Sequence, residues 1–361
     1  MIILGSTGTI GVRSLEIAFR FNKQIEAISA GRNITLLNQQ IAKYKPKKVA
    51  IACEADIDRV ESNGAEVFVG ASGICEMIKS CKSDFVLNGI VGFAGLLPSI
   101  CTQKCGKKLA LANKESLVAG GWLLDTNAIT PIDSEHFGLW YLMRDSSNIK
   151  RLIITASGGA FRDVPLESIA LATKEQALKH PNWQMGQKIT IDSATMANKL
   201  FEALEAYWLF SCSEISAFIE RSSSIHALVE CIDGSTLAHF ALPNMSLPIA
   251  YAIDKTQARE NQILDSIDLV KLGFLKFEAI DTARYPLWGL KDTLIANPKL
   301  GVIINAANEV AVNKFLRDEI GFGKIANIVF SALEKFSDRL GDLLDYEHIE
   351  QLDKEVREAI R

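Results

Sequence analysis

Short apolar runs alternate with amphipathic stretches through the first third of the chain. Ile2-Ile3-Leu4 is the first run, and apolar side chains at helical spacing follow it from Val12 to Phe19. Further strands are expected at residues 25–30, 48–52, 67–69, 85–88 and 109–112. Strands separated by helical or turn segments indicate βαβ units, in which helices cover a parallel sheet. The pattern therefore predicts an α/β fold.

The rest of the chain has a different order of elements. Strands are expected at residues 153–156 and 188–191, and two strand-like runs lie within residues 215–241. Residues 257–286 are mixed in composition and irregular, which is typical of a linker. A helical tail begins near Asn305, with helices around residues 325–336 and 351–360. The predicted domains are residues 1–130, 131–256 and 291–361, with a linker at residues 257–290.

The first strand ends in a glycine-rich turn, Gly5-Ser6-Thr7-Gly8-Thr9-Ile10-Gly11. Glycines between a strand and a helix let the backbone approach a dinucleotide pyrophosphate that lies on the helix N-terminus. The next strand ends in Gly31-Arg32-Asn33, without the Asp or Glu that usually binds the ribose of NAD. A guanidinium suits the 2′-phosphate of NADPH, so NADPH is favoured, although an exposed surface arginine is also common.

Two acidic residues, Asp133 and Glu135, lie two positions apart. If residues 132–135 are extended, both carboxylates point to the same side, and a cation between them would offset their repulsion. Mg²⁺ or Mn²⁺ suits such oxygen ligands, and Glu202 is a candidate third ligand. A solvated acidic turn is the alternative, and Glu202 is the reason to prefer the metal.

Hydroxyl, amide and ammonium groups later in the chain suit a phosphate. Ser157-Gly158-Gly159 follows a predicted strand, and small residues with a hydroxyl can wrap an anion. Ser193 is predicted to cap a helix start, where free N–H groups, Asn198 and Lys199 would bind the phosphate. A plain turn and a solvated helix face remain the alternatives.

A lysine and a glutamate follow the predicted strand at residues 109–112. They are Lys114 and Glu115, within Ala112-Asn113-Lys114-Glu115-Ser116. In open α/β sheets ligands bind beyond the carboxyl ends of the strands, which places this pair well for chemistry. A surface ion pair is the more frequent meaning of such a dipeptide.

Composition limits the class of protein. The 361 residues are 48% hydrophobic and 23% charged, which describes a globular chain long enough for two or three domains. The net charge of -4 argues against a nucleic-acid partner, and no apolar run is long enough for a membrane span. Met1 leads directly into a strand, so we expect a cytoplasmic protein. The seven cysteines contain no C-x-x-C pair and are expected to be reduced thiols.

Five segments occur together in this chain. They are the glycine-rich turn, Ala112-Asn113-Lys114-Glu115-Ser116, Pro131-Ile132-Asp133-Ser134-Glu135-His136, Thr155-Ala156-Ser157-Gly158-Gly159, and the stretch from His180 to Glu202. Their combination strongly resembles the 1-deoxy-D-xylulose 5-phosphate reductoisomerase family, and the resemblance covers essentially the whole chain. It implies a Rossmann-like N-terminal domain, an α/β central catalytic domain that also forms a homodimer, and a C-terminal helical bundle.

The resemblance also implies an activity. Members of the family rearrange 1-deoxy-D-xylulose 5-phosphate and reduce the product with NADPH to 2-C-methyl-D-erythritol 4-phosphate, in non-mevalonate isoprenoid biosynthesis. The reaction requires Mg²⁺ or Mn²⁺. A loop that bears Trp183 and Met185 is expected to close over the sugar phosphate as a flap.

Site residues follow from the same resemblance. The expected metal ligands are Asp133, Glu135 and Glu202, and Lys114 and His180 join them as catalytic residues. The expected substrate contacts are Ser134, Ser157, His180, Trp183, Met185, Ser193, Asn198 and Lys199. The expected cofactor contacts are Gly5, Ser6, Thr7, Gly8, Thr9, Ile10, Gly31, Arg32, Asn33, Asn113, Glu115, Gly186 and Met245.

The chain departs from the family pattern at a few positions. Glu220-Arg221-Ser222-Ser223 stands where the family usually has His-Pro-Gln-Ser, so any role of that histidine is absent or moved. Leu200 replaces a glycine, and Arg32 stands where lysine is also common. Two other functions stay open: a metal-independent NADPH-dependent aldehyde reductase or dehydrogenase, and a non-catalytic NADPH-binding regulator.

Overall fold

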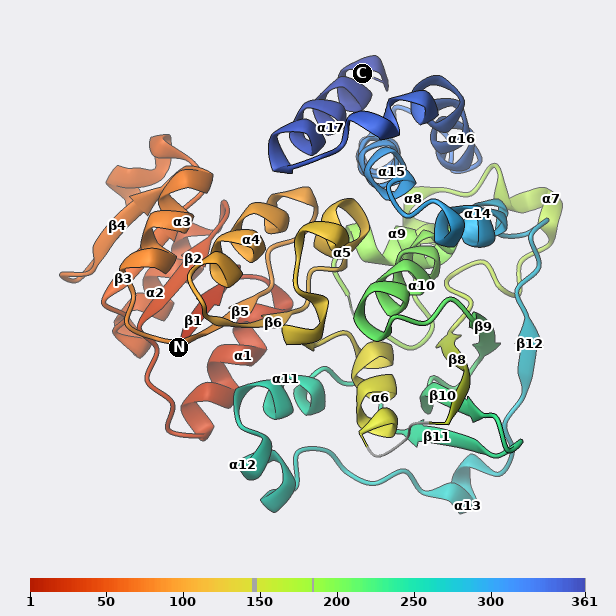
Figure 1. Cartoon of the computed structure of the whole chain (residues 1–361), viewed down its shortest axis with the longest axis horizontal. Helices are drawn as coiled ribbons and strands as arrows, with labels where there is room; N and C mark the ends of the chain where they lie inside the picture. The colour runs from red at the N-terminus through yellow and green to blue at the C-terminus, as the bar shows by residue number, and fades with distance from the viewer. Residues whose placement is uncertain (145–147, 184, 361) are drawn as a thin grey trace. The chain divides into compact units, whose positions relative to one another are not determined.

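The computed structural model describes residues 1–144, 148–183 and 185–360. The chain divides into two compact units, and Figure 1 shows the course of the chain through both. The first unit comprises residues 1–116, 124–134 and 244–265. The second comprises residues 117–123, 135–243 and 266–361. The segment predicted as a linker therefore starts in the first unit and ends in the second.

The first unit is built on a seven-stranded sheet whose strands are all parallel. The strands are β1 (Ile2–Leu4), β2 (Ala27–Ala30), β3 (Lys48–Ile51), β4 (Glu66–Val69), β5 (Phe85–Asn88), β6 (Lys108–Leu111) and β7 (Ile129–Pro131). Their order is β4-β3-β2-β1-β5-β6-β7, so the direction of winding reverses between β1 and β5. Ligands of open α/β sheets bind at such a switch point.

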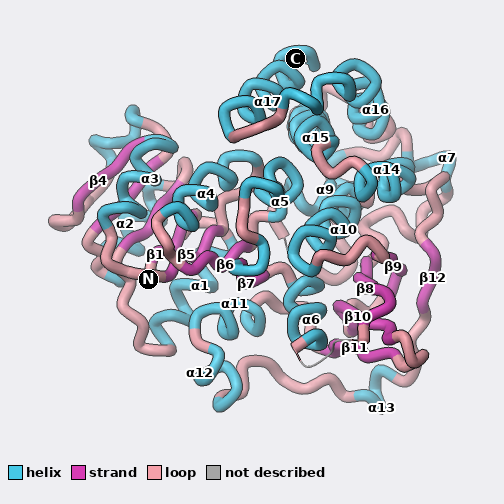
Figure 2. The backbone as a smooth tube through the Cα atoms, in the orientation of Figure 1, coloured by secondary structure: helices cyan, strands magenta, loops and turns pink. Residues whose placement is uncertain are grey.

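Helices cover both faces of this sheet, as Figure 2 shows. The helices of the unit are α1 (Thr9–Arg20), α2 (Ile34–Tyr44), α3 (Gly70–Ser80), α4 (Leu96–Lys104), α11 (Ser246–Ile253) and α12 (Lys255–Glu260). One apolar cluster joins the sheet to α1, α2 and α11, and another joins it to α3 and α4. This two-sided burial explains why the strands are short continuous apolar runs. The predicted Rossmann-like domain is confirmed.

The second unit contains a mixed five-stranded sheet. Its strands are β8 (Ile149–Ala156), β9 (Ile215–Glu220), β10 (Ile225–Cys231), β11 (Thr236–Phe240) and β12 (Phe277–Ala279). The order is β11-β10-β8-β9-β12, and β8 and β9 are the parallel pair. An apolar cluster packs one face of this sheet against α6 (Ser134–Met143) and α10 (Ala197–Phe210).

The remaining helices of the second unit include the predicted C-terminal bundle. Three longer helices form it: α15 (Leu300–Leu316), α16 (Lys324–Phe336) and α17 (Tyr346–Ile360). The shorter helices are α7 (Leu166–Ile169), α8 (Lys174–Ala177), α9 (Gln187–Thr195), α13 (Leu269–Leu272) and α14 (Lys291–Ala296), while α5 (Lys114–Gly120) leads out of the first unit. An apolar cluster with Ile191, Ala194 and Val312 packs α9 against α15.

Two local predictions about secondary structure are wrong. Residues 188–191 are helical and belong to α9, because Ile191 and Ala194 meet the core at helical spacing and Lys188 pairs with Asp192 one turn later. A four-residue apolar and polar alternation was too short to distinguish a strand from a helix. Residues 132–135 are not one extended segment either, since α6 begins at Ser134.

The prediction of seven reduced thiols is wrong for one pair. Cys75 and Cys101 form a disulfide, with their Cα atoms 5.8 Å apart. They come from α3 and α4, which pack side by side on one face of the first sheet. Sequence spacing gave no sign of this pairing, because only the packing of the two helices brings the cysteines together.

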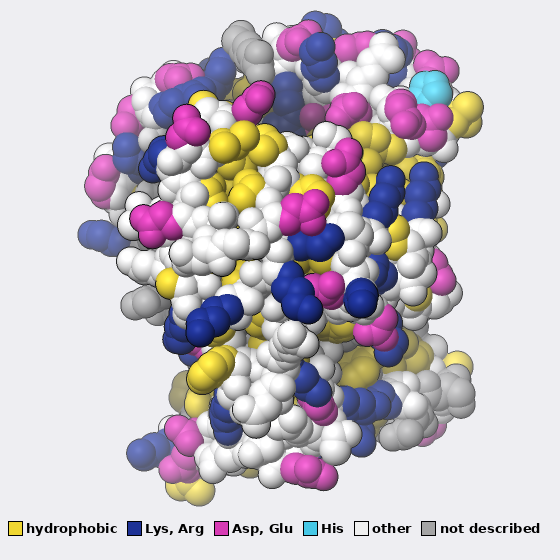
Figure 3. All heavy atoms as spheres, turned by 90° about the vertical axis from the view of Figure 1, so that its left-hand side faces the viewer, with side chains coloured by type: hydrophobic (Ala, Val, Ile, Leu, Met, Phe, Trp, Pro, Cys, Tyr) yellow, Lys and Arg dark blue, Asp and Glu magenta, His cyan; other side chains and the backbone are white. Residues whose placement is uncertain are grey.

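Two further properties of the described residues concern helix hydropathy and the distribution of surface charge. Among the described residues, no helix is both long enough and apolar enough to cross a membrane. On the face drawn in Figure 3, basic and acidic side chains are interspersed. Such mixing suits a chain whose charges nearly balance.

Candidate active site

The glycine-rich turn lies at the switch point of the first sheet. Gly5 has a φ of +72°, and a Cβ there would come within 2.7 Å of the carbonyl oxygen of Gly89, just after β5. A Cβ on Gly11 would meet the Gly5 carbonyl oxygen at 2.2 Å, so only glycine lets α1 approach β1 this closely. Gly8 precedes α1, and its N–H donates to the Gly5 carbonyl at 3.0 Å. The turn thus lies between β1 and the N-terminus of α1, where the sequence placed it.

The other residues of this turn divide between the core and the surface. Ser6 is fully buried, and its hydroxyl donates to the amide oxygen of Gln40 at 2.7 Å. Gly8 and Thr9 are exposed, whereas Thr7 and Ile10 are half-buried. Ser6 therefore holds the shape of the turn, and Thr7 to Ile10 form the part that solvent or a ligand reaches.

The end of β2 carries the predicted adenosine contacts. Gly31, Arg32 and Asn33 are all exposed. Asn33 caps α2, because its side-chain oxygen accepts a hydrogen bond from the N–H of Leu36 at 3.1 Å. The Arg32 guanidinium is left at the surface beyond the strand end, where it can pair with a phosphate.

The segment after β6 is a tightly bonded turn. Asn113 is buried, donates to the carbonyl oxygen of Gly92 at 2.9 Å, and donates to the Glu115 carboxylate at 3.1 Å. Lys114 is also buried, and its ammonium lies 2.8 Å from a carboxylate oxygen of Asp133. The sequence alternative of a surface Lys-Glu pair is wrong, because Lys114 and Glu115 are buried and point to different partners.

The second unit holds two carboxylates around one ammonium, with Glu202 and Lys199 buried and Glu135 half-buried. The carboxylate oxygens that Glu135 and Glu202 offer lie within 4.8 Å of each other. Lys199 donates to both, at 3.2 Å to Glu135 and in a short hydrogen bond to Glu202. Asn198 donates to the other oxygen of Glu202. Burying two carboxylates this close is costly without a cation, and the ammonium offsets that cost here.

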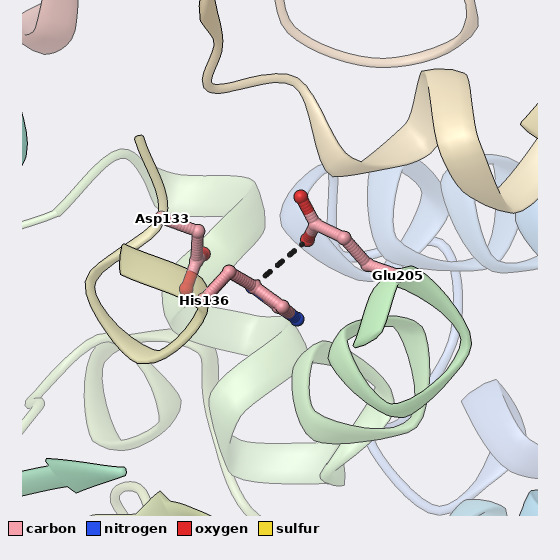
Figure 4. A group of neighbouring side chains, drawn as sticks. All are labelled: Asp133, His136 and Glu205. Atoms are coloured by element: carbon pink, nitrogen blue, oxygen red, sulfur yellow. Dashed lines mark ion pairs between the residues drawn. The ribbon is translucent and has the colours of Figure 1, made fainter. Parts of the chain in front are cut away.

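A second buried pair lies beside this cluster, and Figure 4 shows it. His136 follows Glu135 on α6, and its Nδ1 lies 3.3 Å from a carboxylate oxygen of Glu205. His136 also contacts the backbone carbonyl of Glu202 through Nε2 at 2.8 Å. The sequence analysis did not propose His136 or Glu205 as site residues. Their spacing could have indicated them, because His136 follows the predicted ligand Glu135 and Glu205 lies about one helical turn after the predicted ligand Glu202.

Ser157 and His180 are brought together, as the resemblance implied. Nδ1 of His180 accepts hydrogen bonds from the N–H groups of Asn182 and Trp183, at 3.2 and 2.9 Å. Its Nε2 therefore carries the proton and donates to the Ser157 hydroxyl oxygen at 2.9 Å. The N–H of Gly159 donates to the same oxygen at 3.2 Å. The hydroxyl proton of Ser157 therefore points away from both donors and can form a hydrogen bond to an anion.

The loop after His180 is anchored to the β9–β10 turn. The amide of Asn182 donates to the carbonyl oxygen of Arg221 at 2.8 Å and to the Ser223 hydroxyl at 2.7 Å. The ring of Trp183 meets the His226 ring edge to face, with centroids 6.0 Å apart. Met185 is half-buried, and Gly186 is exposed just before α9.

The prediction that Ser193 caps a helix is wrong. Ser193 lies inside α9, and α10 begins only after Met196, which adopts a left-handed φ of 65° and provides no side-chain cap. Its position still fits an anion site, because a Cβ on Gly159 would come within 2.5 Å of the Ser193 carbonyl oxygen. The turn after β8 and the end of α9 are thus in direct contact. Asn198 and Lys199, in turn, donate to the Glu202 carboxylate.

The departures from the family pattern have structural explanations. The Glu220 carboxylate is buried, and it accepts from the N–H groups of Ser222 and Ser224 and from the Ser222 hydroxyl. These bonds shape the β9–β10 turn. Leu200 is fully buried, so its side chain fills core space that a glycine would leave open.

Two further predicted site residues lie at helix starts. Ser134 is the first residue of α6, and Met245 precedes α11 in the first unit.

Two histidines, His239 buried and His180 half-buried, should make stability depend on pH. Burial, with Arg162 nearby, lowers the pKa of His180 to about 4, and burial, with His226 nearby, lowers the pKa of His239 to about 4. An unfolded chain protonates histidine near pH 6.5, so the free energy of unfolding should fall as pH decreases from about 6.5 to about 4. Thermal unfolding of wild type and of His180→Gln/His239→Gln between pH 7 and 4 checks this. An equal pH dependence in both proteins would contradict it.

Sequence models of one family match the chain in three parts. The 1-deoxy-D-xylulose 5-phosphate reductoisomerase model matches residues 1–121. The models of its C-terminal domain regions match residues 129–210 and 240–359. Nearly the whole chain is thus accounted for by one family.

Relatives and solved structures agree with these matches. A 1-deoxy-D-xylulose 5-phosphate reductoisomerase of Helicobacter pylori is 55% identical over 99% of this chain and 98% of its own, and one of Campylobacter hominis is 52% identical over 100% and 99%. A DOX-P reductoisomerase crystal structure with NADPH, fosmidomycin and magnesium has a TM-score of 0.90 at 32% identity over 99% of this chain and 96% of its own. The Zymomonas mobilis enzyme with NADPH has a TM-score of 0.84 at 34% identity, over 99% and 97%. The chain therefore belongs to the 1-deoxy-D-xylulose 5-phosphate reductoisomerase family.

Proposed function

We propose that the chain converts 1-deoxy-D-xylulose 5-phosphate to 2-C-methyl-D-erythritol 4-phosphate, with NADPH and a divalent metal, in non-mevalonate isoprenoid biosynthesis. The observation that carries the proposal is the close pair of buried Glu202 and half-buried Glu135, with an ammonium that donates to both. A simple reductase has no need for two facing carboxylates in its core. Membership of the family supports the same reaction.

The donor set of this cluster fits Mg²⁺ or Mn²⁺. Glu135 and Glu202 offer hard oxygen ligands within reach of one ion, and the Lys199 ammonium already takes the place of a cation there. We assign Asp133 as the third ligand, because two residues of chain keep its Cα within about 7 Å of that of Glu135. The bound metal supplies a Lewis acid and a template for neighbouring substrate oxygens.

The substrate phosphate is assigned to the turn after β8 and to the end of α9. Ser157 donates its hydroxyl proton because His180 and Gly159 already occupy the oxygen as donors. Ser193 lies against Gly159 and adds a second hydroxyl, and Asn198 and Lys199 are the further partners. With a metal bound, Glu135 and Glu202 would no longer need the Lys199 ammonium, which would then be available to the phosphate. This exchange couples metal binding to substrate binding.

The remaining assignments concern water exclusion and orientation. Trp183 and Met185 form the flap, and Asn182 holds its base on the β9–β10 turn. A closed aromatic flap excludes water from the reacting carbon skeleton. Lys114 and Ser134 orient the sugar, and His180 stays neutral and positions Ser157. We also propose that the predicted domains divide this labour: residues 1–130 bind NADPH, residues 131–256 carry the chemistry and residues 291–361 support it.

NADPH supplies the hydride. We assign its binding to these residues: the Gly5 to Ile10 turn, Gly31 to Asn33, Asn113, Glu115, Gly186 and Met245.

Arg32 should determine which of the two nicotinamide cofactors, NADPH or NADH, the chain prefers. Arg32→Ala removes a charge-assisted contact to the 2′-phosphate, so KM for NADPH should rise about 10- to 100-fold. KM for NADH should stay the same. Steady-state kinetics with both cofactors measure this, and Lys43→Ala at the far end of α2 is the matched control. An equal loss with both cofactors would contradict the assignment.

The activity itself is tested by following NADPH absorbance after adding 1-deoxy-D-xylulose 5-phosphate with Mn²⁺ or Mg²⁺. Oxidation that requires the metal and produces 2-C-methyl-D-erythritol 4-phosphate is expected. Turnover of simple aldehydes after exhaustive chelation, with the ketose phosphate unused, would favour a metal-independent reductase instead. NADPH binding without any turnover would favour a regulatory protein.

We further propose that the second unit forms a homodimer. Exposed apolar side chains lie on its two edge strands, β11 and β12, and on the segment before β12: Leu237, Phe240, Val270, Phe274 and Phe277. Edge strands and apolar side chains of this kind are covered by a second copy in many oligomers. In sedimentation experiments Phe240→Glu/Phe274→Glu should shift the dimer toward monomer, whereas Phe19→Glu in the first unit should not. A monomeric wild type would contradict the proposal.

The proposed setting is the cytoplasm. NADPH is regenerated there, and the sugar phosphate substrate carries a charge that prevents its free passage through membranes. Fractionation of cells that express the chain, followed by the NADPH assay on each fraction, tests this assignment. Activity confined to an extracellular or membrane fraction would contradict it.

A further inference from the structure

A buried hydrogen bond connects the C-terminal helices to the proposed anion site. Asp192 on α9 is buried, and each of its carboxylate oxygens accepts a donor: the Lys188 ammonium at 2.8 Å and the Asn308 side-chain amide at 2.8 Å. Asn308 lies on α15 and is fully buried. A buried carboxylate is stable only when its oxygens are satisfied, so this pairing fixes how α9 is rotated on α15.

The rotation of α9 on α15 determines where Ser193, the residue after Asp192, lies in the proposed anion site. Ser193 is the next residue, and its carbonyl oxygen lies so close to Gly159 that a Cβ there would meet it at 2.5 Å. A shift of α9 therefore displaces either Ser193 or the Ser157-Gly158-Gly159 turn, since no space is left between them. Both hydroxyls depend on one helix orientation.

Neighbouring residues of α15 hold the helix in place as well. One turn before Asn308, the Asn305 amide donates to the Glu309 carboxylate at 3.2 Å. Glu309 pairs with Arg357 of α17 at 2.8 Å, and Arg357 forms two hydrogen bonds to Asp353. The C-terminal helices thus give α15 a fixed place from which Asn308 reaches Asp192.

We infer that Asn308 is a positioning residue for the phosphate of the substrate, acting through Asp192 on Ser193 and on the Ser157 turn. This inference rests on the proposed function, because that function assigns Ser193 and Ser157 to the phosphate. It gives the C-terminal helices a role in substrate recognition although Asn308 itself touches no predicted substrate contact among the described residues. A misplacement of the two hydroxyls by about 1 Å should weaken phosphate binding strongly.

The test compares two matched variants, Asn308→Leu and Asn305→Leu. Leucine has nearly the shape of asparagine, both positions are fully buried on α15, and Asn308 is the one that bonds to Asp192. The readouts are KM for the sugar phosphate, the inhibition constant of inorganic phosphate, KM for NADPH, the Mn²⁺ dependence and the melting temperature. For Asn308→Leu, KM for the sugar phosphate and the phosphate inhibition constant should rise roughly 10-fold or more, with the NADPH and Mn²⁺ values within about 2-fold.

Asn305→Leu removes a bond within α15 but leaves the Glu309–Arg357 pair to α17 and the Asn308–Asp192 bond, so it should lower the melting temperature without changing the phosphate inhibition constant. Equal effects of the two variants on that constant, or no effect of Asn308→Leu, would overturn the inference. If Asn308→Leu does not fold, Asn308→Ser replaces it, because serine is smaller and too short to reach Asp192. A wild type that binds inorganic phosphate but does not turn over the ketose phosphate would refute the proposed function alone. The binding constant of phosphate for the variants would then still decide the role of Asn308.

Discussion

Glu202→Gln should abolish metal-dependent turnover while the protein stays folded. The substitution removes one negative oxygen ligand from the cluster and keeps a single acceptor oxygen, which can serve either Lys199 or Asn198. Lewis-acid catalysis contributes several kcal/mol, so kcat/KM should fall by about 10³-fold or more. The Mn²⁺ concentration that gives half-maximal activity should rise as well. Steady-state rates over a Mn²⁺ titration measure both effects.

Glu230→Gln is the matched control for this variant. Glu230 is a partly buried glutamate of the same unit, and it pairs with Arg151 on the sheet at 2.6 Å. The same chemical change there removes an ion pair away from the carboxylate cluster, so turnover and metal dependence should match those of wild type. If Glu202→Gln kept wild-type rates and the same metal requirement, the metal site would be refuted.

The sequence predicted the first unit well because its signals are local. A glycine-rich turn between a strand and a helix, and short apolar runs at regular spacing, need no tertiary contact to be recognised. The observed φ of Gly5 and the close approach of Gly11 to the Gly5 carbonyl are the physical reasons for that pattern. Strand ends moved by one or two residues, which is the usual uncertainty of such boundaries.

The site was predicted in its residue types but not in its contacts. Lys199 was placed on the phosphate, whereas the structure bonds it to Glu135 and Glu202. That arrangement depends on how α6 and α10 pack, and helix spacing within one element could not reveal it. Ser193 was read as a cap because oxygen side chains favour that position, but the core contacts of α9 extend the helix through it. Asn308 carried no local signal, since its partner lies 116 residues away in sequence.

Lys199→Met should make the stability of the protein depend on divalent metal. In wild type the ammonium bonds to Glu135 and Glu202 in a nearly solvent-free site, where its side chain is 4% exposed. Methionine removes the ammonium that Glu135 and Glu202 share. Breaking a buried pair in this way costs about 3–5 kcal/mol, so the chelated variant should melt well below wild type. Mg²⁺ or Mn²⁺ should raise the melting temperature of the variant much more than that of wild type.

The same substitution should weaken substrate binding by an independent route. The proposed exchange of Lys199 from the carboxylates to the phosphate gives a charge-assisted hydrogen bond of about 1.5–3 kcal/mol, so kcat/KM should fall about 10- to 100-fold even with saturating Mn²⁺. Lys174→Met is the control, because Lys174 pairs with the exposed Asp318 and such surface pairs contribute little. Melting curves in chelator and in Mn²⁺ separate the two effects. A Lys199→Met protein as stable as wild type in chelator would refute the role of the ammonium as a substitute cation, and unchanged kcat/KM would refute its transfer to the phosphate.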